Sequence, residues 1–322
     1  MKKKNPVLVR ISIIITLVTC GMYTPQSSEA QLSLSFRDMP YEIGFNAGPS
    51  FFLGDLGGTF GTGKGFIVDL NLPATRYFVG TTATIYPSSW LGLRGALNFG
   101  ELYGNDAFSS SKDDGRQIRN LDFRTHIFEG YAGLELYPFD LIFSNMDYEP
   151  RIRPYGVLGV GFFHFNPQGT YRNPATGQTS WIDLRPLHTE GEGWGPGFPA
   201  EYNLWQPNIP AGIGAKYDLS DDISISGELL YRFIFTGYVD DVHGQFVQDT
   251  SLFYQHLPAS VAPVAIAMAN KSAFPISHFS TRGDPDKTNA YFSVVVGISI
   301  KFGGPQSWFD RASSETRCPT RW

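Results

Sequence analysis

The amino-acid sequence predicts an all-β fold, an eight-stranded antiparallel transmembrane β-barrel with long extracellular loops. Three observations predict it: short runs in which apolar and polar residues alternate, connectors that are alternately long and short, and an N-terminus with the features of an export signal. Alternation places the two kinds of residue on opposite faces of a strand. A continuous apolar face opposite a small, polar one is typical of strands that contact lipid.

Eight segments show this alternation, and each has at least the roughly 9 to 11 residues that a tilted strand needs to cross a bilayer. The last segment is the clearest, because Val294 and Val296 face one way while Ser293 and Gly297 face the other. The pattern is weakest over 153–165, which is apolar on both faces. The expected strands are 41–53, 77–86, 90–103, 123–137, 153–165, 209–219, 223–238 and 289–303.

The connectors between these strands fall into two classes. Pro87-Ser88-Ser89 and Ser220-Asp221-Asp222 are tight turns. Four long segments rich in Gly, Pro, Asn and Asp alternate with the short connectors, at 54–76, 104–122, 166–208 and 239–288. In an up-and-down barrel with both termini in the periplasm, the long loops face outside. The connector 138–152 falls on the periplasmic side but is long, so it is either an extended turn or a periplasmic contact site.

The faces opposite the apolar ones carry nearly balanced charges, which predicts a plugged lumen rather than an open pore. An eight-stranded barrel has an interior just wide enough to be filled by side chains, and charges placed there need partners. The inward charged set is Glu42, Arg94, Glu129, Glu135, Lys216, Asp218, Glu228, Arg232 and Lys301. A soluble β-sandwich is the alternative, because alternation also describes strands with one solvated face.

Eight of the polar residues are structural candidates in this interpretation. Those expected in the lumen are Glu42, Arg94, Glu129, Glu135, Glu228 and Arg232. Glu228 and Arg232 lie four residues apart and therefore share the inward face of one strand. Asp240 and Asp241 follow the same strand and are expected to shape its exit into the last long loop.

The N-terminus resembles a cleavable signal peptide. Lys2, Lys3, Lys4 and Arg10 precede the apolar run 11–18, and Ser28-Glu29-Ala30 supplies small residues for cleavage. The expected organisation is a signal peptide at 1–30, an outer-membrane barrel at 31–303 and a periplasmic tail at 304–322. This places the protein in the outer membrane of a Gram-negative bacterium, with its termini in the periplasm. Lipoprotein processing at Cys20 is the alternative; cleavage after Ala30 would leave Cys318 without an intramolecular disulfide partner.

The motifs that could carry chemistry are weak. The glycine-rich segment 58–65 comes close to a P-loop, but Gly65 replaces the Ser or Thr that would hold magnesium. The six histidines are scattered, and His126 and Glu129 fall on opposite faces of a strand. A net charge of −5 without a basic cluster argues against nucleic-acid binding. We therefore expect no catalytic, metal or cofactor site and no small-molecule substrate. An outer-membrane hydrolase is an alternative without a defensible Ser, His and acid spacing.

Loops 166–208 and 239–288 could instead bind a ligand, as in an adhesin or surface receptor. The first of them carries Trp181, Trp194 and Trp205 between glycines. Aromatic residues on adaptable loops often bind partners, but they also cap barrels or sit at the membrane interface. Arg282-Gly283-Asp284 resembles an adhesion tripeptide, although solvated loops produce such triplets by chance.

A series of short motifs resembles a known family along nearly all the mature chain. They are Tyr41-Glu42-Ile43-Gly44, Gly54-Asp55-Leu56, 102–106, 119–123, Glu129, Arg153-Pro154-Tyr155, Phe165-Asn166-Pro167, 189–193 and, most specifically, 228–242. Their order and spacing are similar to those of the PorG-like outer-membrane barrels of the Bacteroidetes, which are associated with the type IX secretion system. The chain departs from that pattern at Gly237, where the family usually has aspartate, and at Glu192, where it usually has glutamine. Its last long loop is expanded, and a tail follows the last strand.

The resemblance implies a function that the alternating pattern alone does not indicate. It implies a non-enzymatic barrel that anchors a periplasmic ring of the secretion and gliding machinery to the outer membrane. The expected partners are therefore the periplasmic ring proteins of the type IX system, a lipoprotein and its partner, together with outer-membrane lipid.

Overall fold

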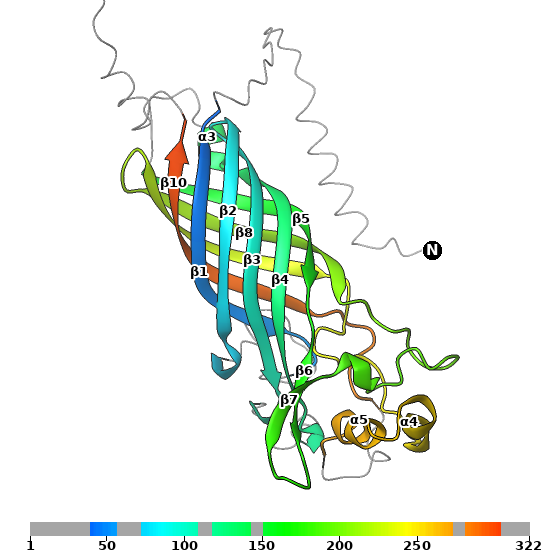
Figure 1. The fold of residues 1–322 in the computed structure, drawn as a ribbon. Helices are drawn as coiled ribbons and strands as arrows, with labels where there is room; N and C mark the ends of the chain where they lie inside the picture. Colours follow the sequence, from blue (N-terminus) through cyan, green and yellow to red (C-terminus); the bar gives the residue numbers. More distant parts are fainter. Residues whose placement is uncertain (1–38, 57–71, 109–117, 143–150, 273–280, 304–322) are drawn as a thin grey trace, which may run out of the picture. The chain divides into compact units, whose positions relative to one another are not determined.

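The computed structural model describes residues 39–56, 72–108, 118–142, 151–272 and 281–303, and eight of its strands form a barrel (Figure 1). The barrel strands are β1 (Tyr41–Leu53), β2 (Arg76–Ser88), β3 (Leu91–Asn105), β4 (Asp122–Leu136), β5 (Ile152–His164), β8 (Trp205–Asp218), β9 (Ile223–Ile234) and β10 (Ala290–Phe302). The predicted signal peptide, the predicted tail, both cysteines and the glycine-rich segment 58–65 lie outside the described residues.

The barrel is a single antiparallel sheet that closes on itself. Each barrel strand pairs with its neighbour along the chain, and β1 pairs with β10, for example Phe45 with Ile298. The closed ring confirms the predicted eight-stranded antiparallel fold and excludes the two-sheet sandwich. A hairpin of β6 (Gln168–Arg172) and β7 (Thr179–Asp183) extends the sheet from β4 through Arg124 and Gln168.

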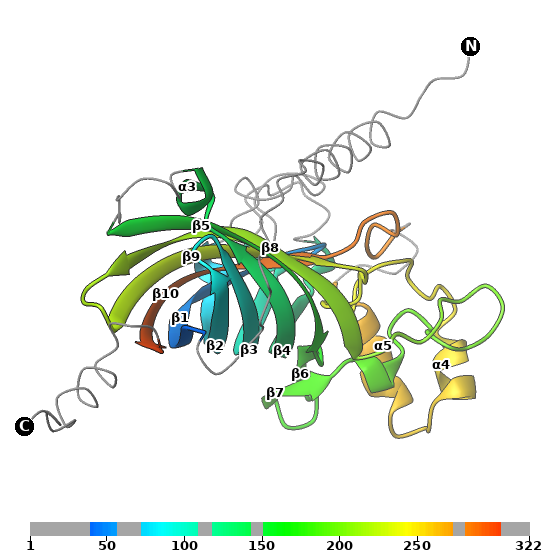
Figure 2. The same cartoon turned by 90° about the horizontal axis from the view of Figure 1, so that it is seen from above.

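The two ends of the barrel differ. One end, which we call the turn end, holds the start of β1, the end of β10, the short β2–β3 and β8–β9 connectors, and α3 (Pro138–Ile142). The opposite, loop end holds the four long loops: first (β1–β2), second (β3–β4), third (β5–β8) and fourth (β9–β10). The β6–β7 hairpin, α4 (Ser251–His256) and α5 (Ala262–Ala269) gather at the loop end (Figures 1 and 2).

Most strand limits agree with the sequence pattern, but two differ. The segment 223–238 was predicted as one strand, whereas β9 ends at Ile234. The chain turns there because the Thr236 hydroxyl accepts a hydrogen bond from the Tyr238 amide and because Asp241 adopts a left-handed φ of 60°. β8 starts at Trp205 rather than at 209, since Pro207 and Pro210 interrupt the propensity signal although the strand accommodates both.

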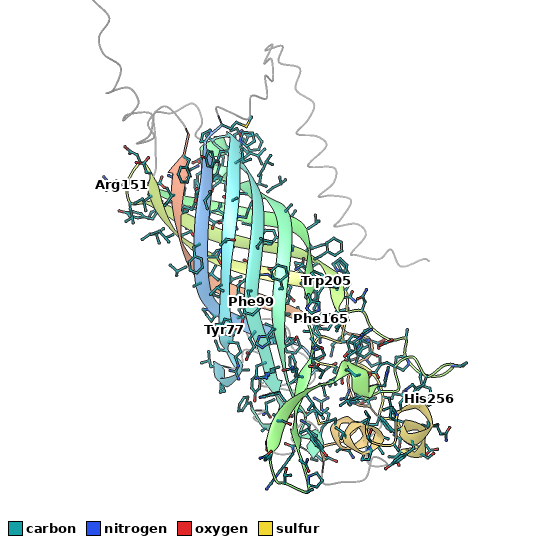
Figure 3. All side chains as sticks on the ribbon, viewed as in Figure 1. Tyr77, Phe99, Arg151, Phe165, Trp205 and His256 are labelled. Carbon is teal, nitrogen blue, oxygen red and sulfur yellow. The ribbon has the colours of Figure 1, made fainter. Side chains whose placement is uncertain are left out.

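An apolar belt surrounds the barrel. Side chains such as Ile43, Leu97, Phe162 and Val296 point outward and are exposed, while their strand neighbours are largely buried. Aromatic side chains at the loop end of the belt include Tyr77, Phe99 and Trp205 (Figure 3). At the turn end Tyr41 stacks on Phe302, with 5.1 Å between ring centroids, and Tyr217 is exposed. A belt with aromatic borders on a closed barrel is the lipid-contacting surface of an outer-membrane type β-barrel.

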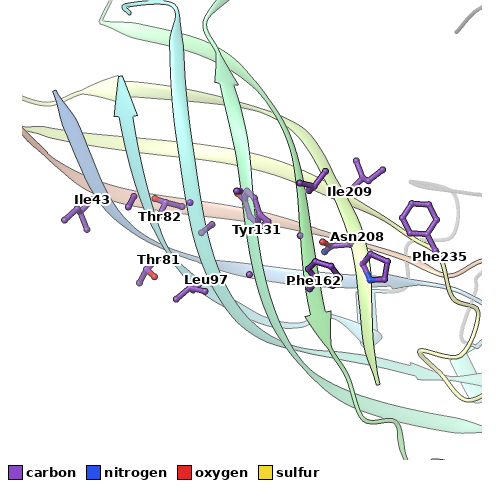
Figure 4. Close-up of a pocket in the computed structure, with 17 residues that line it drawn as sticks. Ile43, Thr81, Thr82, Leu97, Tyr131, Phe162, Asn208, Ile209 and Phe235 are labelled. Carbon is purple, nitrogen blue, oxygen red and sulfur yellow. The ribbon is translucent and has the colours of Figure 1, made fainter. Parts of the chain in front are cut away.

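A shallow hollow of about 760 Å³ interrupts the belt (Figure 4). Small residues at matching register positions, Ala83, Gly95 and Ala132, leave room between Ile43 and Val160. Its lining contains no charged side chain, and it opens among exposed belt residues. The hollow is therefore a feature of the apolar wall and offers little to a polar ligand. Among the described residues, no helix has the length and apolar character to cross a membrane.

Candidate functional site

The polar side chains form two clusters, one inside the barrel and one beneath the loops. All six predicted lumen residues point inward, in two layers. In the layer nearer the turn end, Glu135 accepts the Arg94 Nε at 2.5 Å and the Lys216 Nζ at 3.1 Å. Lys216 also contacts Glu42 at 3.1 Å, and Arg94 contacts Glu228 at 2.6 Å. Three carboxylates and two cations thus form one network.

The second lumen layer is built around Glu129, which is fully buried. Arg232 meets both of its carboxylate oxygens, with the Nε at 3.2 Å and the Nη2 at 3.1 Å. The amides of Asn98 and Asn208 and the hydroxyl of Tyr291 also donate to Glu129. Both oxygens of this carboxylate thus accept hydrogen bonds, and these bonds offset the cost of burying its charge.

Tyrosines that the alternating pattern does not single out complete the network in the turn-end layer. Tyr137 donates to Glu135 at 2.5 Å, Tyr86 donates to Glu42 at 2.7 Å, and Tyr155 donates to Glu228 at 2.9 Å. These tyrosines lie on the inward face, where their hydroxyls reach the carboxylates. A pocket beside Glu42, Arg94, Lys216 and Glu228 has a volume of about 20 Å³, roughly enough for one water. This part of the lumen is plugged.

The second cluster lies at the loop end and joins all four long loops; we call it the cap cluster. Its members are Asp55 from the first loop, Asp106 and Arg119 from the second, Glu190 and Glu192 from the third, and Asp240, Asp241 and Arg282 from the fourth. All except Asp55 are buried. Asp240 and Asp241, predicted at the exit of the strand that carries Glu228 and Arg232, therefore belong to a larger assembly.

Arg119 holds the first, second and fourth loops together. Its Nε and Nη2 donate to the two carboxylate oxygens of Asp106, each at 2.8 Å. The same guanidinium donates to the backbone carbonyls of Asp55 and Arg282. Asp240 adds a contact between the first and fourth loops, because it accepts the Leu56 amide at 3.3 Å.

Arg282 does the same for the third and fourth loops. It contacts Glu190 at 3.1 Å and Asp241 at 3.5 Å, and it donates to the Asp241 backbone carbonyl. Asp241 also accepts hydrogen bonds from Thr189 at 2.5 Å and from Tyr202 at 2.7 Å, both in the third loop. The amides of His243 and Gly244 donate to Glu190.

The cap cluster has an excess of acid, six carboxyl groups against two guanidinium groups. Burial raises the pKa of Glu192 to about 8, and the nearby Asp241 and Glu190 add to the shift. Burial likewise raises the pKa of Asp240, with Asp55 contributing. The Glu192 Oε1 and Asp240 Oδ1 atoms are buried without a hydrogen-bond partner among the described residues. A buried acceptor without a donor is stabilised by taking up a proton.

The structure also places the other residues singled out from the sequence. Arg282 of the Arg282-Gly283-Asp284 triplet is buried in the cap cluster, so this triplet is not presented as an adhesion motif. Trp194 folds back and stacks on His256, with 4.8 Å between ring centroids, while Trp205 lies on the belt. Trp181 packs under Arg124, whose guanidinium carbon lies 4.4 Å from the ring centroid.

No potential metal-binding group of three or more His, Cys, Asp or Glu residues occurs within the part of the chain that the structure describes. His126 is half exposed on the outer face of β4, whereas Glu129 is fully buried in the lumen. The two side chains therefore cannot bind one ion together, as their spacing on a strand predicts.

Comparison with known proteins gives likeness of fold only. No family model and no curated protein matches the chain. Three similar solved structures are Ail, the attachment invasion locus protein of Yersinia pestis (10% identity, TM-score 0.35), Neisserial surface protein A (11%, 0.34) and a major outer membrane protein from Thermus thermophilus (12%, 0.38). The alignments cover 82%, 82% and 81% of this chain and 99%, 97% and 99% of those chains, respectively. At such TM-scores, the barrel assignment rests on the strand pairing itself.

Replacing Arg232 by methionine should destabilise the barrel by about 3–5 kcal/mol, because Glu129 would be left as a buried, unpaired charge. The effect is measured as the urea concentration at which half of the protein is unfolded. The folded fraction is read from the band with the mobility of the folded barrel on unboiled gels. Lys287→Met is the control, since the Lys287–Asp284 pair is exposed and worth about 0–1 kcal/mol. Equal midpoints for the two variants would contradict the assigned role of Arg232.

The cap should loosen as the pH rises from 4.5, the ordinary pKa of a glutamate, to about 8, the raised pKa of Glu192. A carboxyl group whose pKa is raised in the closed state stabilises that state at low pH, and the stabilisation is lost as the group ionises. Limited proteolysis of the third and fourth loops across this pH range tests the prediction, with an unfolded substrate correcting for protease activity. Glu192→Gln should flatten the profile, whereas Glu201→Gln, at an exposed pair with Arg185, should leave it unchanged.

Arg282→Met should open the third and fourth loops while leaving the strands closed. Loss of a buried cation facing two carboxylates costs about 3–5 kcal/mol, which raises the open population on the order of 100-fold or more. Faster cleavage of these loops on reconstituted protein, with unchanged gel mobility of the barrel, is the expected result. Lys287→Met in the fourth loop serves as the control, because its pair with Asp284 is exposed. Cleavage at the wild-type rate would contradict the role of Arg282.

Proposed function

We propose that the chain is a non-enzymatic outer-membrane barrel that serves as a structural subunit of the type IX secretion and gliding machinery. In this proposal the turn end faces the periplasm and the loop end faces outside, as short and long connectors do in outer-membrane barrels. The barrel tethers a periplasmic ring complex, a lipoprotein and its partner, to the outer membrane.

The observation that carries the proposal is the convergence of the family-like motifs in space. Asp55, Asp106, Arg119, Glu190 and Asp240 come from motif segments that are far apart in the sequence, yet all belong to the cap cluster. Motifs that depend on one another in three dimensions support a resemblance to a whole fold rather than to isolated peptides. The tightly paired lumen supports a structural role over transport.

A surface receptor or adhesin is the second candidate, and the loop end supplies the observation that favours it. Tyr254 on α4 is exposed, and His256 stacks on Trp194 at the same place. Figure 3 shows His256 far from the belt, among the helices of the fourth loop. Exposed aromatic groups on a rigid support are common in binding surfaces.

Deleting the gene and assaying secreted cargo and ring assembly tests the first candidate. We expect both to fail and to be restored by the intact chain. A chain with residues 251–269 replaced by a flexible linker should also restore secretion, because α4 and α5 lie at the end opposite to the proposed periplasmic partner. Normal export and ring assembly in the deletion strain would refute the secretion role. Restored secretion combined with lost surface binding would instead assign α4 and α5 to a receptor surface.

A further inference from the structure

The turn end carries an apolar surface that continues beyond the barrel strands. It consists of Phe139, Leu141 and Ile142 of α3, Ile152 at the start of β5 and Leu219 after β8, and we call it the rim patch. Ile142 is 69% exposed, Ile152 59% and Leu219 55%. Single exposed apolar side chains are normal on a protein surface, but a group of this size marks a contact surface.

The rim patch begins at the level where the lipid-facing belt ends. Ile152 pairs with Tyr217 across the β5–β8 ladder, and Tyr217 is one of the exposed aromatic residues of the turn end. Leu219 directly follows the end of β8 and is exposed as well. Leu136, the last residue of β4, is an exposed belt residue and directly precedes Tyr137 and α3. The patch is thus continuous with the surface that contacts lipid.

α3 is fixed to the barrel by its only charged residue. Asp140 accepts the Arg153 Nε at 3.0 Å and Nη2 at 2.8 Å, and the Arg153 guanidinium lies over the ring of Tyr137. The Leu141 amide donates to the Tyr137 carbonyl at 3.1 Å. Because Asp140 is paired with the barrel, the exposed surface of α3 presents only apolar side chains. Such a surface enters an apolar environment without desolvating a charge.

We infer that the rim patch lies in the lipid leaflet at the turn end, with α3 as a short in-plane foot. Its apolar side chains enter the boundary between the headgroups and the acyl chains. Lipid fits the patch, because the patch prolongs the belt and the exposed side chains of α3 are apolar. Arg151, exposed next to Ile152, is suited to lipid phosphates. The inference goes beyond the proposed function and needs only a barrel in a bilayer.

Site-specific fluorescence on the purified full chain, with Cys20 and Cys318 replaced by serine, tests this inference. An environment-sensitive fluorophore is attached to Ile142→Cys or Leu219→Cys in vesicles of phosphatidylethanolamine and phosphatidylglycerol. Some of the lipids carry a spin label near the acyl carbonyl. Ser220→Cys, at the exposed turn next to Leu219, is the matched control. Gel mobility before and after boiling verifies that each variant is folded.

We expect blue-shifted emission and several-fold stronger quenching by the spin-labelled lipid at both patch positions than at Ser220→Cys. Water-like emission at Ile142→Cys and Leu219→Cys in the folded barrel would overturn the inference. Shielding that arises only after membrane extract containing periplasmic proteins is added would also overturn it and would assign the patch to a protein partner. Because the vesicles contain no secretion component, failure here leaves the secretion assay unaffected, and the converse also holds.

Discussion

The structure depends on the pairing of buried charges inside the barrel. Glu129 and Glu135 are fully buried, so each must be surrounded by donors or the closed state would be costly. The pairs cross the lumen, since Glu129 on β4 meets Arg232 on β9, and Arg94 on β3 meets Glu228 on β9. Because opposite walls are joined in this way, the pairs set the cross-section of the barrel as well as satisfying their own charges.

The same rule gives a different result under the loops, where acid exceeds base. In the turn-end layer of the lumen, three carboxylates face only two cations, Arg94 and Lys216. Three tyrosine hydroxyls donate hydrogen bonds to these carboxylates and partly compensate for the missing positive charge. The cap has fewer donors for its six carboxyl groups, and burial raises the pKa of several of them. The barrel therefore combines a charge-paired interior with a cover in which acid exceeds base.

Much of the barrel could be predicted from the sequence because period-two alternation directly reports which face of a strand is buried. The same alternation correctly predicted that Glu42, Arg94 and Arg232 point into the lumen, because the residues next to them along each strand lie on the opposite, apolar face. The hairpin of β6 and β7 could not be predicted, because two five-residue strands in a glycine-rich loop carry too little pattern. The cap cluster was missed for another reason: its members come from four loops, and no local pattern connects Arg119 with Asp106 and Arg282. Among the members of the cap cluster, Asp240 and Asp241 alone were predicted as structural residues, through their position after the strand that carries Glu228.

The seam between β1 and β10 has a consequence for how the molecule is made. Its partners, such as Tyr41 and Phe302, are separated by almost the whole described chain. Contacts of such high sequence separation form late, because a long segment must be ordered before they are gained. Until β10 arrives, β1 has an unpaired edge that invites pairing with other chains. The barrel can therefore close only when the chain has been made as far as β10. A chain truncated before residue 290 lacks the strand that pairs with β1 and cannot form a closed wall.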